Sequence, residues 1–313
     1  MMKNIVEKST RDAYGECIVE IGKQNKNVVV LTADLMHSNK LEEFKKQFPE
    51  RFFNFGMAEQ NMVGAAAGLA TCNKIPFVST FACFASMRAC EQIRTDIAYP
   101  KLNVKIVVTH GGITMGAGGT THHATEDIAI MRSIANMTVI VPSDAVETKK
   151  AIKAAIKYLG PVYIRLGRDA DPIVNTQNYE YKIGKASILR EGKDVVIIAM
   201  GRMVAESLEA AIQLERDGIK AGVINMHTIK PIDKEAIIEA VRKTKFIVTV
   251  EEHNIVGGLG SAVAEVIAEE QRCCFVRRIG IPDIFVTIGS YEDLLSKYNL
   301  NGKGIAEQIR RKL

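Results

Sequence analysis

Glu59 is the residue whose type and surroundings point most clearly to chemistry. It lies in the run FFNFGMAEQNMVGAAAGLA (52–70), among hydrophobic residues that include Phe55, Met57 and Met62. A carboxylate in apolar surroundings either keeps its proton or has a specific partner, because an unpaired buried charge is costly. The simpler alternative is that Glu59 only stabilises the first turn of a helix, whose positive end favours an acidic residue.

Two phenylalanines form a second candidate group. Phe81 and Phe84 lie in STFACFASMR, where they follow the apolar run PFVST (76–80). Their three-residue spacing predicts that both rings lie on one side of a turn that enters a helix. An aromatic pair by itself favours a place in the core, so its interpretation depends on the neighbouring motifs.

A glycine-rich loop follows another apolar run. His110 comes after VKIVVT (104–109), and the loop beyond it contains five glycines before His122 and His123. Such a loop exposes backbone N–H groups and lets a ligand approach closely. Histidines on it suit proton transfer or hydrogen bonding to hydroxyl groups. A metal site is less favoured, since no third ligand lies nearby at motif spacing.

Arginines at element ends could bind an anion. Arg11 lies early in the first predicted helix, and Arg165 and Arg168 end a strand-like run. Guanidinium groups suit an anionic group of a substrate, although a surface ion pair is the alternative. These three positions are always charged, whereas the charge of His110 could switch with pH.

Two further segments are weaker evidence. Asp34 ends the strand-like run 27–34 and Ser38 follows it, and capping of the next helix by Ser38 or Asn39 would account for that segment. The GGLG run in EEHNIVGGLG resembles a nucleotide-binding loop, but a lone run of this kind is not specific. His253 in the same segment could equally be structural.

Composition excludes several classes of protein. The chain has 313 residues, 47% hydrophobic and 25% charged, and its net charge of +5 contains no long basic block. We therefore expect two ordinary domains and no nucleic-acid binding. The six cysteines contain no CxxC pair, which predicts reduced thiols in the cytoplasm. No signal region or 18-residue apolar span occurs, so we expect no membrane association.

The candidate residues must be positioned by alternating strands and helices. Apolar strand-like runs separated by helical stretches predict parallel sheets covered on both faces. In the first half the runs are 27–34, 76–80, 104–109, 138–144 and 161–165, with helices near 10–24, 59–72, 84–97, 124–134 and 144–158. In the second half the runs 194–200, 221–226, 246–252 and 274–280 alternate with helices at 203–217, 233–243 and 257–270.

The alternation of strands and helices is interrupted by a polar, proline-containing segment, 167–188, which we interpret as a linker with a short hairpin. The prediction is an α/β fold with two doubly wound domains, residues 1–166 and 190–313, joined by a linker over 167–189. Ligands of such sheets gather at the carboxyl ends of the strands.

Taken together, these segments resemble the C-terminal half of transketolases over essentially the whole chain. The motifs that look like their family counterparts, in order and spacing, are STRDAYGE, TADLMHSN, FNFGMAEQNMVGAAAGLA, VSTFACF, VTHGGITMG, TTHH, VPSD and VEEHNIVGGLG. The resemblance implies a thiamine-diphosphate pyrimidine-binding domain followed by a transketolase C-terminal domain. The family's GDG motif, which holds the metal and the diphosphate, does not occur here. This chain therefore looks like one subunit of a split transketolase.

The resemblance implies a role for each candidate residue. Glu59 would share a hydrogen bond with N1′ of the cofactor's aminopyrimidine, Phe81 would stack on that ring, and Phe84 would line its pocket. Asp34 matches a position near the cofactor, and His122 matches a catalytic-site histidine that contacts the hydroxyl groups of the donor sugar. The family's phosphate-binding positions are matched by Arg11, Ser38, His110 and Arg168.

The implied reaction is transfer of a two-carbon ketol unit from a ketose, expected to be phosphorylated, to an aldose. The implied cofactors are thiamine diphosphate and Mg²⁺, with the metal held mainly by an N-terminal partner subunit that carries GDG. We expect no metal ligands in this chain and an α2β2 heterotetramer. The Ala- and Gly-rich helix after Glu59 would pack at a subunit interface.

Alternatives remain open at the level of the substrate and the reaction. Gly118 stands where ordinary transketolases carry Asp, and Met87 where Tyr is common. The donor could therefore be apulose 4-phosphate or a sulfonated ketose. A second reading is the E1 β subunit of a 2-oxoacid dehydrogenase, and a third is a non-catalytic binding partner that kept the fold.

Overall fold

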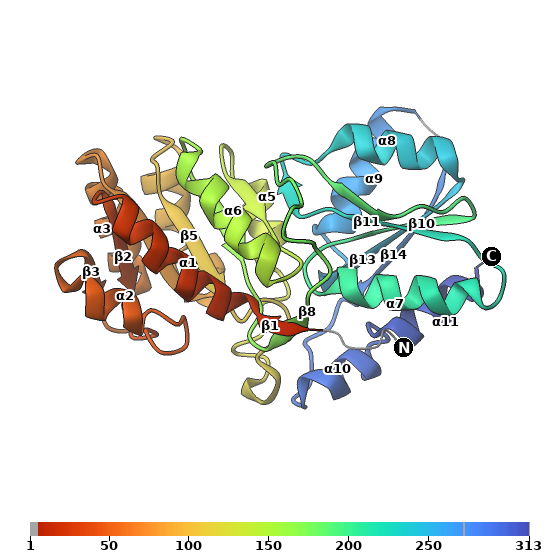
Figure 1. Ribbon diagram of the computed structural model, residues 1–313, viewed down its shortest axis with the longest axis horizontal. Helices are drawn as coiled ribbons and strands as arrows, with labels where there is room; N and C mark the ends of the chain where they lie inside the picture. The colour runs from red at the N-terminus through yellow and green to blue at the C-terminus, as the bar shows by residue number, and fades with distance from the viewer. Residues whose placement is uncertain (1–5, 272, 313) are drawn as a thin grey trace.

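The computed structural model describes residues 6–271 and 273–312. The first half of the chain folds around a seven-stranded sheet with the strand order β12-β6-β7-β5-β4-β2-β3 (Figure 1). Its strands are β2 (Val28–Thr32), β3 (Phe52–Asn54), β4 (Ile75–Phe81), β5 (Lys105–Thr109), β6 (Thr138–Ile140), β7 (Val162–Arg165) and β12 (Thr228–Lys230). All neighbours are parallel except β12, which runs antiparallel to β6. The apolar runs predicted as strands in this half are thus confirmed.

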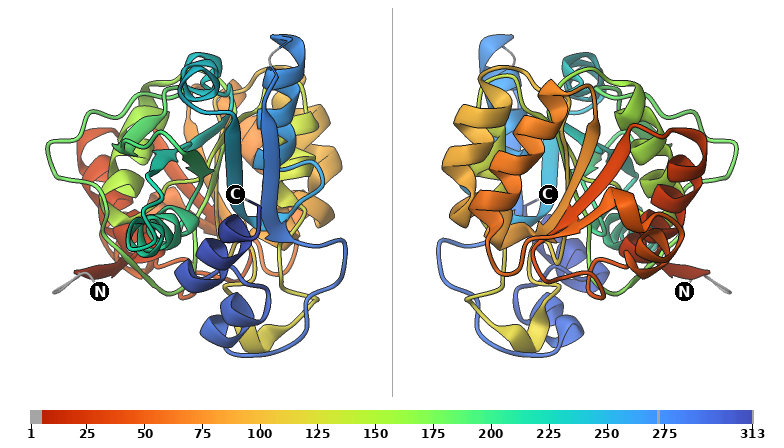
Figure 2. Two further views of the ribbon diagram at one scale, coloured as in Figure 1. Left: turned by 90° about the vertical axis from the view of Figure 1, so that its right-hand side faces the viewer. Right: turned by 90° about the vertical axis from the view of Figure 1, so that its left-hand side faces the viewer.

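Helices cover both faces of this sheet, as the fully apolar strands require. One face packs against α1 (Thr10–Gln24), α2 (Glu42–Gln47) and α6 (Ala145–Lys157). The other packs against α3 (Glu59–Thr71), a helical stretch over 84–98 and α5 (Asp127–Ser133). The right-hand view of Figure 2 looks along this half and shows helices on either side of the strands.

The second half forms a five-stranded sheet with the order β14-β13-β10-β11-β9. Its strands are β9 (Ser187–Arg190), β10 (Val195–Ala199), β11 (Ala221–Asn225), β13 (Phe246–Asn254) and β14 (Phe275–Ile281), and only the edge strand β9 is antiparallel. Helices α7 (Met203–Glu215) and α11 (Gly302–Arg310) pack on one face. Helices α8 (Lys234–Lys243) and α9 (Leu259–Glu269) pack on the other. The predicted α/β architecture with two parallel, doubly wound sheets is confirmed.

The predicted hairpin in the linker is wrong. Strand β8 (Ala170–Pro172) pairs with β1 (Glu7–Ser9) near the N-terminus, and β9 joins the second sheet. Turn residues and a proline indicated a break between domains, but they could not indicate which distant strands would use the segment. Among the described residues, no helix combines the length and apolarity that a bilayer crossing requires.

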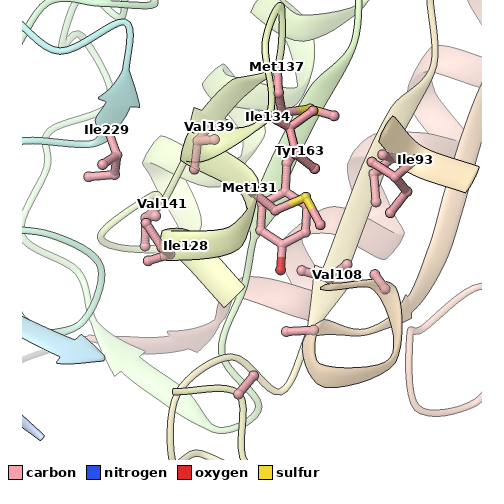
Figure 3. Close-up of a cluster of buried hydrophobic side chains, with 14 of the residues drawn as sticks. Ile93, Val108, Ile128, Met131, Ile134, Met137, Val139, Val141, Tyr163 and Ile229 are labelled. Carbon is pink, nitrogen blue, oxygen red and sulfur yellow. The ribbon is translucent and has the colours of Figure 1, made fainter. Parts of the chain in front are cut away.

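The two sheets share one continuous core. Figure 3 shows part of it, where Val139 and Val141 of the first half lie on the side that faces Ile229 of β12. Because β12 comes from the second half of the chain but completes the first sheet, backbone hydrogen bonds cross between the halves. The relative position of the halves is therefore fixed by strand pairing as well as by packing.

Candidate functional site

Glu59 is the first residue of α3 and is only 1% exposed. The start of a helix favours a negative charge, because its first backbone N–H groups lack partners within the helix. In addition, Nη1 of Arg88 donates a hydrogen bond to Oε2 of Glu59 at 2.7 Å. Of the two expectations for this carboxylate, a specific partner is the one realised. Met57, a hydrophobic neighbour of Glu59 in the sequence, is 84% exposed and does not bury the carboxylate.

Four aromatic rings gather at the ends of β4 and β5. The ring centroids of Phe81 and Phe84 lie 5.7 Å apart with an interplanar angle of 25°. His110 packs on Phe81 at a centroid distance of 4.1 Å, and His122 lies 5.5 Å from Phe84. Segments that are separate in the sequence therefore meet, as expected for the carboxyl ends of neighbouring parallel strands.

Arg88 is a site residue that sequence reasoning missed. Its guanidinium lies over the Phe84 ring at 4.2 Å from the centroid while it binds Glu59, so it links the aromatic group to the carboxylate. Its position four residues after Phe84 was the available signal, because residues at this spacing lie on one helix face. Phe84, Met87 and Arg88 also line a cavity of ≈ 500 Å³.

His110 is buried and neutral. Its Nδ1 lies 2.8 Å from Oγ1 of Thr109, whose hydroxyl donates to Oδ1 of Asn39 at 2.7 Å. Burial, with repulsion from Arg11 and Arg168, lowers the pKa of His110 to about 3. The expectation of a switchable charge is therefore wrong, because the ring is too far from water to hold a proton near neutral pH.

Arg11 and Arg168 line one open cleft of ≈ 910 Å³. Nη1 of Arg11 donates to the backbone oxygen of Ser38 at 3.1 Å, so Arg11, Ser38 and Arg168, three of the predicted phosphate-site residues, lie together. Burial lowers the pKa of Arg11, although a guanidinium stays protonated at any physiological pH. The cleft is mixed in charge, since its other lining residues include Lys40, Asp12, Glu16, Glu42, Glu43 and Asp169.

Asp34 lies apart from these groups. It is exposed, and its backbone N–H donates to Oδ1 of Asn54 at 2.9 Å. The expectation that Ser38 or Asn39 caps the next helix is wrong, because α2 follows Leu41 without a side-chain cap. Asn39 is instead fully buried and held by Thr109, so its amide belongs to the site rather than to the helix start.

Arg165 does not join Arg168 as an anion ligand. It is 6% exposed, and its Nε lies 3.1 Å from Oδ2 of Asp127. Its Nη2 donates to the carbonyl oxygens of Ala124 and Glu252 at 3.1 and 2.9 Å. Arg165 is therefore a structural cation whose hydrogen bonds reach both halves of the chain.

The GGLG run is not a free anion-binding loop. The side chain of Glu251 accepts hydrogen bonds from the backbone N–H groups of Leu259 and Gly260 at 2.7 and 2.9 Å. The start of α9 is thus occupied by a carboxylate of the protein itself. His253 is fully buried beside it and has a structural role, because its Nε2 accepts from the backbone N–H of Ala129.

No group of three or more His, Cys, Asp or Glu side chains that could hold a metal ion occurs in the described part of the chain. The site contains instead a buried carboxylate, two nearly parallel phenyl rings and, beyond His110, two guanidinium groups. The carboxylate and the phenyl rings fit a flat heteroaromatic ring that hydrogen-bonds to an acid, and the two guanidinium groups fit an anion.

Comparison with known proteins identifies two family domains. The family model described as the pyrimidine-binding domain of transketolase matches residues 6–172. The model of the transketolase C-terminal domain matches residues 184–305.

Several relatives align over nearly the whole chain. A putative transketolase C-terminal section of Methanocaldococcus jannaschii is 51% identical over 98% of this chain and 97% of its own length. A 6-deoxy-6-sulfo-D-fructose transketolase subunit of a Clostridium species is 44% identical over 94% of this chain and 91% of its own. One of the subunits of an apulose-4-phosphate transketolase of Phocaeicola vulgatus is 40% identical over 98% and 97%, respectively.

A solved structure has the same fold throughout. It is described as a split-gene transketolase in an inactive β4 tetramer, and it superposes with a TM-score of 0.87 at 49% identity, covering 97% of each chain.

Proposed function

Because the chain belongs to the transketolase family, we propose that it is the C-terminal catalytic subunit of a two-chain transketolase, which moves a two-carbon ketol unit from a ketose to an aldose. The observation that carries this proposal is the buried carboxylate of Glu59 at the edge of an aromatic group made by Phe81 and Phe84. Thiamine-dependent ketol transfer is the chemistry consistent with this family.

Thiamine diphosphate, when bound, supplies the nucleophilic carbon and the electron sink that the cleavage of a ketose needs. Glu59 would hold the proton shared with N1′ of its aminopyrimidine, while Phe81 would stack on the ring and Phe84 would close its pocket. Arg88 would have to share Glu59 with the ring or move aside. Asp34, exposed at the end of its strand segment, is proposed only as a neighbour of the cofactor.

The diphosphate and Mg²⁺ are assigned mainly to the partner subunit. The GDG motif that holds them in the family does not occur in this sequence, and the site described here offers rings, one carboxylate and cations rather than a set of metal ligands.

The substrate's phosphate would bind beside Arg11 and Arg168 in the cleft of mixed charge that they line. Arg11 and Arg168 provide the charge, and His110 is a neutral hydrogen-bonding group because its pKa is lowered to about 3. Ser38 completes the predicted set, and its backbone carbonyl accepts a hydrogen bond from Arg11. His122, at the edge of the aromatic group, would contact the donor's hydroxyl groups near the reacting carbons and help to orient them.

The donor sugar is the open part of the proposal. Pentose phosphates are the ordinary donors of the family, but two relatives are named for a sulfonated fructose and for apulose 4-phosphate. Gly118 in place of an acidic residue also removes one acceptor for a sugar hydroxyl. A panel of ketose donors that differ at this carbon separates these substrates.

The proposed assembly is an α2β2 heterotetramer with an N-terminal subunit. Helix α3, which begins at Glu59, leaves Gly64, Ala65 and Gly68 at least partly exposed, and small residues allow a partner to approach closely. A relative described as an inactive β4 tetramer is consistent with a chain that needs its partner for activity. The cytoplasmic location stays a prediction from the cysteine pattern.

The test is reconstitution of this chain with a GDG-containing N-terminal subunit, thiamine diphosphate and Mg²⁺. We expect ketol transfer by the pair, none by either chain alone, and loss of transfer in Glu59→Gln and Glu59→Ala. Glu239→Gln, which changes an exposed carboxylate of α8, is the control. Full activity of Glu59→Ala would refute the proposal, as would a preference for decarboxylating a 2-oxoacid with a lipoyl acceptor.

A further inference from the structure

The loop that carries His122 is closed at its base and held from outside. Gly112 and Ala124 exchange backbone hydrogen bonds at 3.0 and 2.8 Å, which makes residues 112–124 a closed loop. Five glycines between His110 and His122 leave this segment with much conformational freedom to lose. A fixed position for His122 therefore requires contacts from other elements.

The first contact comes from β13. Oε1 of Glu252 accepts a hydrogen bond from the backbone N–H of Ile113 at 2.6 Å, and Oε2 accepts from the hydroxyl of Tyr291 at 2.8 Å. All three residues are buried. Gly112 has φ of 61°, and a Cβ there would overlap the Glu252 side chain, so the loop and the carboxylate are in close contact.

The second contact lies at the other side of the loop's base. Nη2 of Arg165 donates both to the carbonyl of Ala124, which ends the loop, and to the carbonyl of Glu252. A Cβ at Gly111 would meet the Arg165 side chain. The positive charge of Arg165 is balanced by Asp127, so the base of the loop rests on a paired, hydrogen-bonded cation.

The third contact is at the tip. Oγ1 of Thr120 donates to the carbonyl of Val286 at 2.9 Å, and Gly116 and Gly119 lie against Gly289 and Ile288. In both views of Figure 2 the yellow loop lies beside the blue segment that leads into α10 (Tyr291–Lys297). The tip and one side of the base are thus held by the second half of the chain.

We propose that the C-terminal domain acts in catalysis as a clamp on this loop, with Glu252 and Tyr291 as positioning residues for His122. The inference rests on the proposed function, because it takes His122 as the residue that contacts the donor sugar. Glu252 and Tyr291 act through the loop, because Glu252 binds Ile113, Tyr291 binds Glu252, and neither lines the cavity beside Phe84. The clamp therefore affects recognition of the ketose more than binding of the cofactor.

The test compares two variants at separate contacts with one control. Tyr291→Phe removes the hydroxyl bound to Glu252 at the base, and Thr120→Val removes the hydroxyl bound to Val286 at the tip. Tyr179→Phe is the control, because the Tyr179 hydroxyl donates to buried Glu147 at 2.7 Å, away from the loop. Each variant is measured as the purified chain and as the reconstituted pair.

In the chain alone, we expect amide hydrogen exchange in peptides covering 111–124 to be about tenfold faster in Tyr291→Phe and Thr120→Val, the size expected for one lost hydrogen bond. In the pair, we expect the KM for the ketose to rise about tenfold, with kcat and the Kd for thiamine diphosphate within about twofold of the wild type. Tyr179→Phe should change neither the exchange of residues 111–124 nor the KM for the ketose.

Two results would refute the proposal that the C-terminal domain positions His122 by holding this loop. One is unchanged exchange and KM in both variants, and the other is a fall in kcat or cofactor affinity without a change in KM. If Tyr291→Phe does not fold, Thr120→Val decides by itself, since its side chain is at the surface. Absence of ketol transfer in the wild-type pair refutes the proposed function instead, while the exchange experiment still decides whether the C-terminal domain holds the loop.

Discussion

Arg88 and Glu59 form an asymmetric ion pair, with the carboxylate buried and the guanidinium half exposed. Arg88 also covers the ring of Phe84, so one residue contacts both groups proposed to hold the cofactor ring. Because Glu59 is away from water, loss of Arg88 would leave a buried charge without its partner.

A double-mutant cycle measures this pair in the purified chain. We expect Arg88→Met to lower the free energy of unfolding by about 1–2 kcal/mol, since an unpaired buried acceptor remains but Arg88 itself is partly screened. In Arg88→Met/Glu59→Gln the loss should be smaller than the sum of the single variants. The cycle on the exposed pair Arg242 and Glu239 is the control, and equal coupling in both cycles would show that burial adds nothing.

Phe81 provides a test of the cofactor site. Phe81→Leu keeps an apolar, although smaller, side chain and removes the flat surface on which a pyrimidine would stack. We expect the Kd for thiamine diphosphate in the reconstituted pair, measured by calorimetry, to rise about fivefold, as for the loss of one aromatic contact. Phe275→Leu, on a half-exposed ring of β14, is the control. An unchanged Kd in Phe81→Leu would place the cofactor ring elsewhere.

Gly118 provides a test of donor specificity. In Gly118→Asp the new carboxylate would restore an acceptor for a sugar hydroxyl, and its Cβ would overlap the Met115 side chain, which would have to shift. We expect the ratio of kcat/KM between ketoses that have and lack the hydroxyl to rise about tenfold. Gly118→Asn, an acceptor without charge, should give a smaller rise. A ratio equal to that of the wild type would remove Gly118 from donor recognition.

His253 should make the fold sensitive to acid. Burial lowers the pKa of His253 to about 4, so the unfolded chain, with a pKa near 6.5, binds the proton more tightly. The stability that neutral His253 contributes is fully present above pH 6.5 and is lost as the pH falls through 4. The whole contribution of neutral His253 to the free energy of unfolding is about 3 kcal/mol.

The measurement is the free energy of unfolding between pH 7 and 4 in the wild type and in His253→Gln. Glu251, 3.7 Å from His253, has a pKa raised to about 7 by burial and titrates in the opposite sense, so the difference between proteins is more informative than either slope. We expect a shallower fall in the variant. His37→Gln, at an exposed histidine, is the control, and parallel curves for the wild type and His253→Gln would contradict the prediction.

The sequence predicted the elements around the site well, because their signals are local. Apolar runs predicted the buried strands, and the position of Glu59 at the start of a helix followed from the composition of a single segment. It failed where distant segments meet. Strand β12 completes the first sheet from residue 228 onward, and β8 pairs with β1, and neither pairing leaves a periodic pattern in the chain.

Residue types and spacing by themselves determined that Glu59, the two phenylalanines, the histidine loop and the arginines are candidates for chemistry. Only the tertiary structure separated their roles. It placed Arg11 and Arg168 in one cleft, buried Arg165 against Asp127, and gave Glu251 to the start of α9. A side chain's charge state and partners depend on which surfaces cover it, and that is decided by contacts between residues far apart in the sequence.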